Sequence, residues 1–310
     1  MSPAEMPGRR VHVTAWGHTD TGRVRSENQD TFLVAELSHG ENGKRFLLGP
    51  GSHPPGGAGD PAFTLGPRGA LLLVADGMGG PAGGGRASRL ALAAVTGLIE
   101  REWLSEPTAT PQGFTEILRR AVATANQRVR SEAEGDPALF GMGTTLTMAG
   151  LLDGGAYLVQ IGDSRGYLLR EGQLFQLTRD QSMVQELLDA GAITEAEARN
   201  SPQRNVILQA LGTAPELDPV LGYQELRRGD LLLLCSDGLS GLVPSQAIAR
   251  ILNEPATTLQ HRCEALVEAA NFAGGPDNIT VVLARVEGDG VPPAQPGDPV
   301  VPRPLEAGLS

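Results

Sequence analysis

Five aspartates stand at the ends of segments whose patterns predict strands, and most of them adjoin a turn-forming residue. They are Asp30, Asp76, Asp163, Asp237 and Asp277. A carboxylate at the mouth of a buried strand is unfavourable unless a partner neutralises it, and several together repel one another. A hard divalent cation removes both penalties, because Mg²⁺ and Mn²⁺ prefer oxygen ligands. The pattern therefore favours a metal centre built from carboxylates.

A simpler explanation exists for each aspartate taken alone. Asp76-Gly77 and Asp237-Gly238 are also sequences that make turns, and an isolated Asp-Gly pair is more often a turn than a metal site. The metal interpretation depends on finding several such positions in a chain that offers no other set of catalytic residues.

Hydrophobic patterning predicts the elements that must position these aspartates. Apolar positions three and four apart predict a helix over 87–99, another after Pro111 and a third around 259–270, whereas residues 181–212 are helical in pattern but polar. Segments of strand length and pattern occur at 11–16, 31–36, 70–75, 144–151, 156–161, 166–170, 174–177, 221–226, 231–235 and 278–286.

The order of these elements predicts the fold. Turn sequences such as Asp153-Gly154-Gly155 join consecutive strands into hairpins, and the helices come mostly in pairs. Hairpins favour antiparallel sheets, and paired helices bury their apolar stripes against a sheet. We expect an α+β fold, a four-layer α-β-β-α sandwich in which helix pairs flank two antiparallel sheets. One domain would span 11–287, between a flexible leader at 1–10 and a disordered proline-rich tail at 288–310, with an irregular Gly/Pro-rich insertion at 38–69.

The composition disfavours several classes of function. The formal net charge is −11, whereas domains that bind nucleic acid present a basic face. Cys235 and Cys263 lie in apolar contexts and are expected as buried free thiols. No apolar stretch approaches the ~20 residues of a membrane span, and residues 1–10 lack the apolar core of a signal peptide. We expect a monomer in the cytoplasm, without a membrane partner.

A set of motifs in a fixed order carries a family resemblance. They are RVRSENQD (23–30), LLLVADGMGG (71–80), GMGTTL (141–146), QIGDSRGYLLR (160–170), LLCSDGLSGLV (233–243) and GPDNITVVLARV (275–286). Together they resemble the PP2C-like (PPM) serine/threonine protein phosphatases, in their bacterial branch, over roughly residues 10–287. The resemblance implies the same α-β-β-α sandwich.

The resemblance also implies the ligands of a metal centre. Asp76 would bridge two metal ions, and the backbone carbonyl of Gly77 would bind one of them. Asp237 and Asp277 would complete the protein ligands of the other ion, and Asp163 with Asp237 matches a third-metal position of bacterial members. The implied cofactors are Mn²⁺ or Mg²⁺, two per site with room for a third.

Two further residues are implied to act on substrate and water. Arg25 would grip the substrate phosphate, because a planar guanidinium can bond two oxygens at once, and Asp30 would orient the attacking water. With Asp76 they form the predicted catalytic set. The implied reaction is metal-dependent hydrolysis of phosphoserine and phosphothreonine in proteins, a chemistry that needs mainly positioning and charge neutralisation. The implied partners are phosphorylated proteins, among them a eukaryotic-type Ser/Thr kinase and its substrates.

Several positions depart from the family pattern. Met78 stands where eukaryotic members carry a histidine, so the group that protonates the leaving oxygen is unassigned. Gln29 replaces a common glutamate. Residues 179–212 resemble the mobile flap of bacterial members, with Gln181 in place of a common histidine. An ordinary pair of surface helices is the alternative for this segment.

Other interpretations of the motifs are weaker. The glycine-rich segment 80–87 follows a strand, but it lacks the Lys and Ser or Thr of a P-loop. Residues 162–166 fit the nucleophile-elbow pattern, yet a hairpin sequence follows where a helix is required. A catalytically weak phosphoprotein-binding or partner-switching regulator on the same fold is the alternative function.

Overall fold

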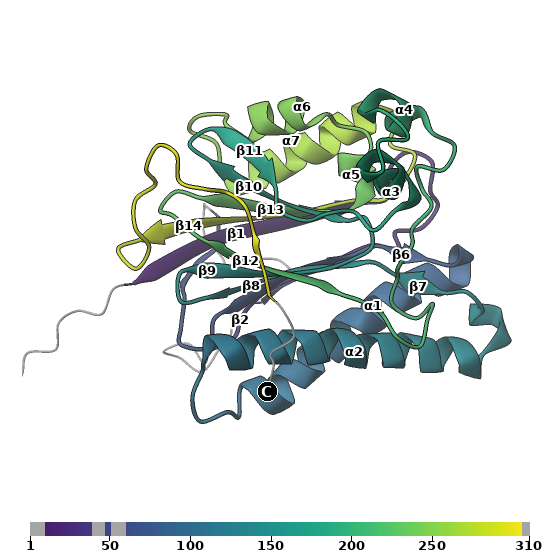
Figure 1. The fold of residues 1–310 in the computed structure, drawn as a ribbon, viewed down its shortest axis with the longest axis horizontal. Coiled ribbons are helices and arrows are strands. Elements are labelled where there is room, and N and C mark those ends of the chain that lie inside the picture. Colours follow the sequence, from purple (N-terminus) through teal and green to yellow (C-terminus); the bar gives the residue numbers. More distant parts are fainter. Residues whose placement is uncertain (1–9, 39–46, 51–59, 306–310) are drawn as a thin grey trace, which may run out of the picture.

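Two antiparallel sheets packed face to face make the centre of the molecule (Figure 1). The structure, a computed structural model, describes residues 10–38, 47–50 and 60–305, so residues 1–9 of the predicted leader lie outside the described residues. The first sheet has the order β11 (Gln173–Gln176), β10 (Arg165–Arg170), β13 (Leu231–Cys235), β14 (Ile279–Gly288), β1 (Val11–Asp20), β4 (Ala62–Thr64).

The second sheet is built mainly from the middle of the chain. Its order is β15 (Arg303–Pro304), β12 (Val220–Glu225), β9 (Gly155–Ile161), β8 (Leu146–Leu152), β5 (Ala70–Ala75), β2 (Thr31–Glu36), β3 (Leu47–Leu48). A short ladder joins β6 (Gly77–Met78) to β7 (Gly143–Thr144). Neighbouring strands are antiparallel in both sheets, as the hairpin sequences predicted.

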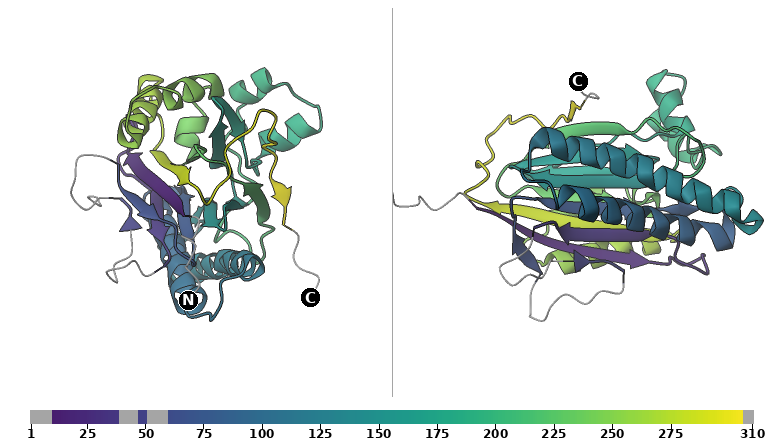
Figure 2. Two further views of the ribbon diagram at one scale, coloured as in Figure 1. Left: turned by 90° about the vertical axis from the view of Figure 1, so that its left-hand side faces the viewer. Right: turned by 90° about the horizontal axis from the view of Figure 1, so that it is seen from below.

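Helix pairs cover the outer face of each sheet (Figure 2). The helices α1 (Gly80–Leu98) and α2 (Pro111–Gly135) pack on the second sheet, and α6 (Ser245–Leu252) and α7 (Leu259–Phe272) pack on the first. The predicted four-layer sandwich is therefore confirmed. The short helical segments are η1 (Ile99–Trp103), η2 (Pro137–Leu139), α3 (Met183–Asp189), α4 (Glu195–Asn200) and α5 (Asp237–Ser240).

The apolar pattern of β5 shows how one strand serves two cores. Alternate side chains of a strand point to opposite faces of the sheet. Leu71 and Leu73 join the core under α1 and α2, whereas Leu72 and Val74 join the core between the two sheets. Both faces of β5 are thus covered, which explains why its sequence is a continuous apolar run rather than an alternating one.

The helix α1 begins earlier than the apolar pattern predicted. The pattern begins at Ala87, but the helix begins at Gly80. The glycines of its first turns carry no periodic signal, and they allow close packing: a Cβ on Gly83 would lie 2.7 Å from the Cβ of Met142. The boundaries of α2, by contrast, follow the sequence, because Pro111 is its first residue and the Thr110 side chain caps it by accepting from Gly113 N.

The prediction of a disordered tail over 288–310 is wrong for residues 288–305. Here β15 pairs with β12 at the edge of the second sheet, Val291 is fully buried, and Arg227 Nε donates to Asp298 Oδ2 at 2.8 Å. These are isolated contacts at single positions, so they leave no periodic pattern in the sequence. Residues 306–310 lie outside the described residues.

The other predicted irregular segments are only partly described. The insertion 38–69 contributes β3 and β4 to the sheet edges, while residues 39–46 and 51–59 lie outside the described part. Residues 181–212 hold α3 and α4 on the surface, and their mobility stays a prediction. In the part of the chain that the structure describes, no helix has the length and apolar character to cross a membrane.

Candidate active site

Strand register brings the five predicted aspartates to one end of the sandwich. In the second sheet, Thr31 at the start of β2 pairs with Ala75 at the end of β5. Asp30 and Asp76 are the adjoining residues, so they become neighbours. In the first sheet, Cys235 at the end of β13 pairs with Arg165 at the start of β10 and with Val281 near the start of β14. This register gathers Asp163, Asp237 and Asp277.

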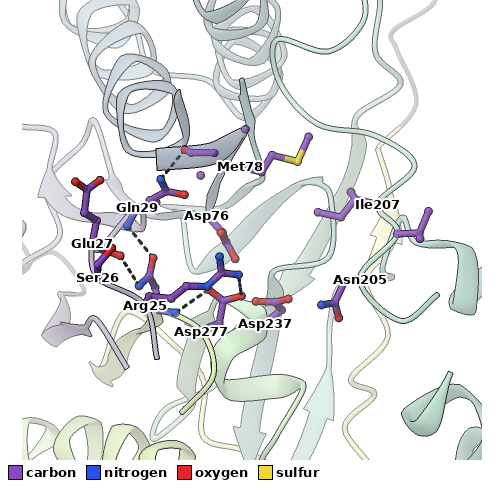
Figure 3. Close-up of a pocket in the computed structure, with 15 residues that line it drawn as sticks. Arg25, Ser26, Glu27, Gln29, Asp76, Met78, Asn205, Ile207, Asp237 and Asp277 are labelled. Carbon is purple, nitrogen blue, oxygen red and sulfur yellow. Dashed lines mark hydrogen bonds and ion pairs between the residues drawn. The ribbon is translucent and has the colours of Figure 1, made fainter. Parts of the chain in front are cut away.

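A cavity of about 530 Å³ opens at this end. Asp76, Asp237 and Asp277 line it, and Figure 3 shows their carboxylates pointing toward one another with Arg25 beside them. Asp30 and Asp163 are buried residues outside the lining, at 7% and 6% exposed. Of the predicted metal ligands, Asp76, Gly77, Asp237 and Asp277 thus line one cavity and Asp163 does not.

Close backbone packing holds this arrangement in place. A Cβ on Gly77 would lie 2.1 Å from the carbonyl oxygen of Gly84, and a Cβ on Gly238 would lie 1.9 Å from that of Asn278. Neither position has room for a side chain. The glycine after each aspartate therefore lets Asp76 and Asp237 approach the neighbouring backbone, beyond any role in turning the chain.

The buried carboxylates are short of partners. Among the described residues, the Oδ1 atoms of Asp30, Asp163 and Asp237 are buried without a hydrogen-bond partner. Burial raises the pKa of Asp30 to about 7 and the pKa of Asp163 to about 8, with the charge of Asp237 adding to the shift. Burial and the surrounding aspartates also raise the pKa of Asp76 well above its ordinary range, and that of Asp237. The cluster therefore disfavours its own full ionisation.

A divalent cation fits this donor set. The side chains facing the cavity offer several carboxylate oxygens, which suits Mg²⁺ or Mn²⁺, and the thioether sulfur of Met78 is a poor ligand for such hard cations. As the described side chains stand, no three acidic, histidine or cysteine residues already converge on a single ion position. Such ions keep several water ligands and need only one or two carboxylates each, so a pair of aspartates per ion is sufficient.

Arg25 already interacts with one of these aspartates. Its Nη2 donates to Asp277 Oδ2 at 2.7 Å, with 54% and 31% of the two side chains exposed (Figure 3). This contact occupies an oxygen that a cation would use. Arg25 therefore lies next to the carboxylates and lines the same cavity.

Asn278 holds the loop that carries Arg25. Its Nδ2 donates to the carbonyl oxygens of Thr21 and Glu27, each at 2.9 Å, and its Oδ1 accepts from Gln29 N at 2.8 Å. Both N–H groups and the oxygen of the Asn278 amide thus bond to one loop. The sequence analysis did not single out this residue, although it directly follows Asp277 within a quoted motif.

Two other contacts were also missed from the sequence. Ser236 Oγ donates to Asp30 Oδ2 at 2.8 Å, which orients that carboxylate and leaves Oδ1 free. Asn205, Val206 and Ile207 line the cavity from the segment after α4. A serine beside Asp237 carried a weak signal. Residues 205–207 lie within the segment 179–212 that resembles the family's flap, but their residue types did not single them out as lining a site.

Comparison with known proteins identifies the family. The family profile described as protein phosphatase 2C matches residues 60–269. The serine/threonine protein phosphatase PstP of Mycobacterium tuberculosis is 45% identical over 217 residues, which make up 70% of this chain. The chain belongs to the protein phosphatase 2C family.

The family members differ in how much of their length the chain spans. The matched region is 40% of M. tuberculosis PstP. The serine/threonine phosphatase stp of Listeria monocytogenes is 39% identical over 269 residues, which make up 86% of this chain and 93% of that protein. A crystal structure of the PstP catalytic domain in complex with two manganese ions has a TM-score of 0.69 and 36% identity, covering 89% of this chain and 99% of that one.

Proposed function

We propose that this protein hydrolyses phosphoserine and phosphothreonine in other proteins and requires Mn²⁺ or Mg²⁺ to do so. The observation that carries the proposal is the convergence of Asp76, Asp237 and Asp277 on one cavity, backed by buried carboxylate oxygens without partners in the described structure. Membership of a phosphatase family and a relative's structure with two manganese ions support it.

The proposed metal ligands are the residues named from the sequence. Asp76 and the carbonyl of Gly77 would serve one ion, and Asp76, Asp237 and Asp277 the other. Asp163 and Asp237 would hold a third. Divalent cations bound here supply charge neutralisation and a water of lowered pKa.

The remaining roles belong to side chains that touch substrate or water. Arg25 would bind the phosphate, exchanging its contact with Asp277 for one with phosphate oxygens. Asp30 would orient the attacking water through Oδ1, since Ser236 occupies its other oxygen. Met78 lines the cavity but has no proton to donate, so the leaving oxygen would take its proton from water.

The expected partners are phosphorylated proteins in the cytoplasm, including a eukaryotic-type Ser/Thr kinase and its substrates. The alternative is a regulator that binds phosphoproteins on the same fold and turns them over slowly. Measuring turnover distinguishes the two functions, because a regulator would bind a phosphopeptide without metal-dependent release of phosphate.

The test is hydrolysis of p-nitrophenyl phosphate and of a phosphothreonine peptide in Mn²⁺, Mg²⁺ or EDTA. We expect phosphate release with either cation, and a rate loss of at least ~100-fold in EDTA, which corresponds to about 2.7 kcal/mol of activation barrier. Equal rates in Mn²⁺ and EDTA would reject the mechanism. Peptide binding without phosphate release would favour the regulator.

A further inference from the structure

The cavity has two unlike walls. One side carries the carboxylates of Asp76, Asp237 and Asp277 together with Arg25. Asn205 and Ile207 lie on the opposite side (Figure 3). Val206 belongs to the same stretch of the lining. A phosphate group needs only the charged side, so the apolar side is unexplained by the phosphate alone.

The apolar wall, residues 205–208, carries three apolar side chains after the polar Asn205. Val206 and Ile207 line the cavity, and Leu208 is the next residue, outside the lining. Val206 is 42% exposed and Leu208 is 45% exposed. Single exposed apolar residues are common on protein surfaces and need no explanation by themselves. Val206 and Ile207 differ from such residues because they line the same cavity as the aspartates.

Backbone hydrogen bonds fix the apolar wall in place. Met183 N donates to Val206 O at 2.9 Å, and Leu208 N donates to Gln181 O at 2.8 Å. The wall is therefore an ordered ladder, and a preorganised surface loses little entropy when it binds.

Gln181 connects these residues to the segment that carries Asp163. Its backbone N–H donates to Gly162 O at 2.9 Å, and its side-chain Oε1 accepts from Gly162 N at 2.8 Å. Gly162 directly precedes Asp163, so hydrogen bonds tie the apolar wall to the same end of the sandwich as the aspartates.

The size of the cavity allows more than a phosphorylated side chain to enter. Its volume of about 530 Å³ lies within the range of about 300–1,000 Å³ that holds drug-sized ligands. A substrate whose phosphate lay at Arg25 and the aspartates would therefore have room in the same cavity for a residue next to the phosphorylated one, and Val206 and Ile207 line that cavity.

We propose that the apolar wall 205–208 is a specificity surface for substrates with an apolar side chain adjacent to the phosphorylated serine or threonine. This rests on the proposed phosphatase function and names its substrate class. Contact with Val206 and Ile207 removes apolar surface of both molecules from water, whereas a polar neighbour gains nothing there.

The experiment compares two phosphothreonine peptides that differ only in the residues flanking the phosphothreonine, which are leucine in one and serine in the other. The readout is the ratio of their kcat/KM values in Mn²⁺. This ratio cancels any change in the amount of active enzyme. We expect the wild type to favour the leucine peptide by about 10-fold, on the scale of a few methylene groups in an apolar site.

Two variants and a matched control decide the outcome. The preference should fall to about 2-fold or less in Val206→Ser and in Ile207→Ser, as most of the apolar contact is lost. Val220→Ser is the control, because Val220 is similarly exposed at 48% but lies on β12 outside the cavity lining. It should keep the wild-type ratio.

The outcomes separate this inference from the function on which it rests. Metal-dependent hydrolysis of both peptides at equal rates by the wild type would overturn the specificity surface alone. A preference that survives both variants would overturn it too. Failure of the wild type to hydrolyse either peptide in Mn²⁺ would overturn the proposed function, and the inference with it.

Discussion

The strands β10 and β13 have buried charges at both of their ends, and the two ends treat them in opposite ways. At one end, Arg170 and Asp230 are 5% and 1% exposed, and Arg170 Nε donates to Asp230 Oδ1 at 2.9 Å. Asp230 also accepts from Arg227 N, and Arg170 donates to the carbonyl oxygens of Glu225 and Pro299. The protein supplies every partner from its own chain.

At the other end of the same strands, Asp163 and Asp237 have buried Oδ1 atoms with no partner among the described residues. Burial raises the pKa of both carboxyl groups. Buried charge is thus paired at the end with Arg170 and Asp230, and unpaired at the end with Asp163 and Asp237. We therefore expect a ligand of opposite charge to bind at the end with Asp163 and Asp237, whereas Arg170 and Asp230 neutralise each other without one.

The largest expected effect is a loss of stability at the end where Arg170 and Asp230 pair. Asp230→Ala would leave Arg170 buried and unpaired, and removing one partner of a buried pair costs about 3–5 kcal/mol. We expect the free energy of unfolding in urea to fall by that amount in EDTA. Glu134→Ala, which removes a surface pair with Arg130, is the control and should change it by less than about 1 kcal/mol. A loss for Asp230→Ala no larger than the control's would contradict the comparison.

The next effect concerns the end with Asp163 and Asp237, where a substitution should lower activity without lowering stability. Asp237→Asn removes a proposed ligand, and we expect metal-dependent kcat/KM to fall by ~100-fold or more, since changes beyond the ligands alone cost about 10–100-fold. The same substitution relieves repulsion with Asp277. The variant should thus be at least as stable as the wild type in EDTA, as measured by thermal unfolding. If the variant were inactive and also less stable than the wild type in EDTA, Asp237 would be a residue that stabilises the fold, as Asp230 is, and the comparison would be contradicted.

The pH dependence of stability should also distinguish metal-free from metal-bound protein. Asp30 and Asp163 have folded-state pKa values of about 7 and about 8, above their ordinary 3.8. At pH values between the ordinary pKa of 3.8 and these raised values, the folded state binds more protons than the unfolded state. The free energy of unfolding therefore falls as the pH rises. In EDTA we expect a loss of at least about 2 kcal/mol between about pH 5 and pH 8, since Asp30 alone contributes roughly that much. Saturating Mn²⁺ should reduce or reverse this slope, because the ion binds the ionised carboxylates. Parallel slopes in both conditions would show that no cation couples to these groups.

The sequence predicted the strands and helices that have a regular pattern of apolar residues. Strands β2, β5 and β13 occupy the predicted residues, because apolar runs between turn residues define them locally. The convergence of the aspartates followed from their place at strand ends, once the strands were known to be antiparallel. Their individual roles came from the family resemblance.

What the sequence could not show depends on single contacts between distant residues. Arg170 and Asp230 are 60 positions apart, and although Arg170 ends the quoted motif 160–170, nothing in the motif pairs it with Asp230. The segment from Val291 to β15 and the apolar wall 205–208 are likewise held by a few hydrogen bonds that have no periodic pattern in the sequence. Such contacts become visible only when the backbone has placed both partners.

The smallest effect separates an exposed ion pair from the two buried clusters. Arg25 and Asp277 are half-exposed, so their contact contributes little to stability. Arg25→Ala should raise the KM for p-nitrophenyl phosphate about 10-fold, on the scale of a lost charge-assisted hydrogen bond. It should not weaken activation by Mn²⁺, because it frees an Asp277 oxygen. Arg23→Ala, two positions away and outside the cavity lining, should leave both quantities unchanged. Weaker Mn²⁺ activation in Arg25→Ala would mean that the arginine holds Asp277 in place for the cation rather than competing with it.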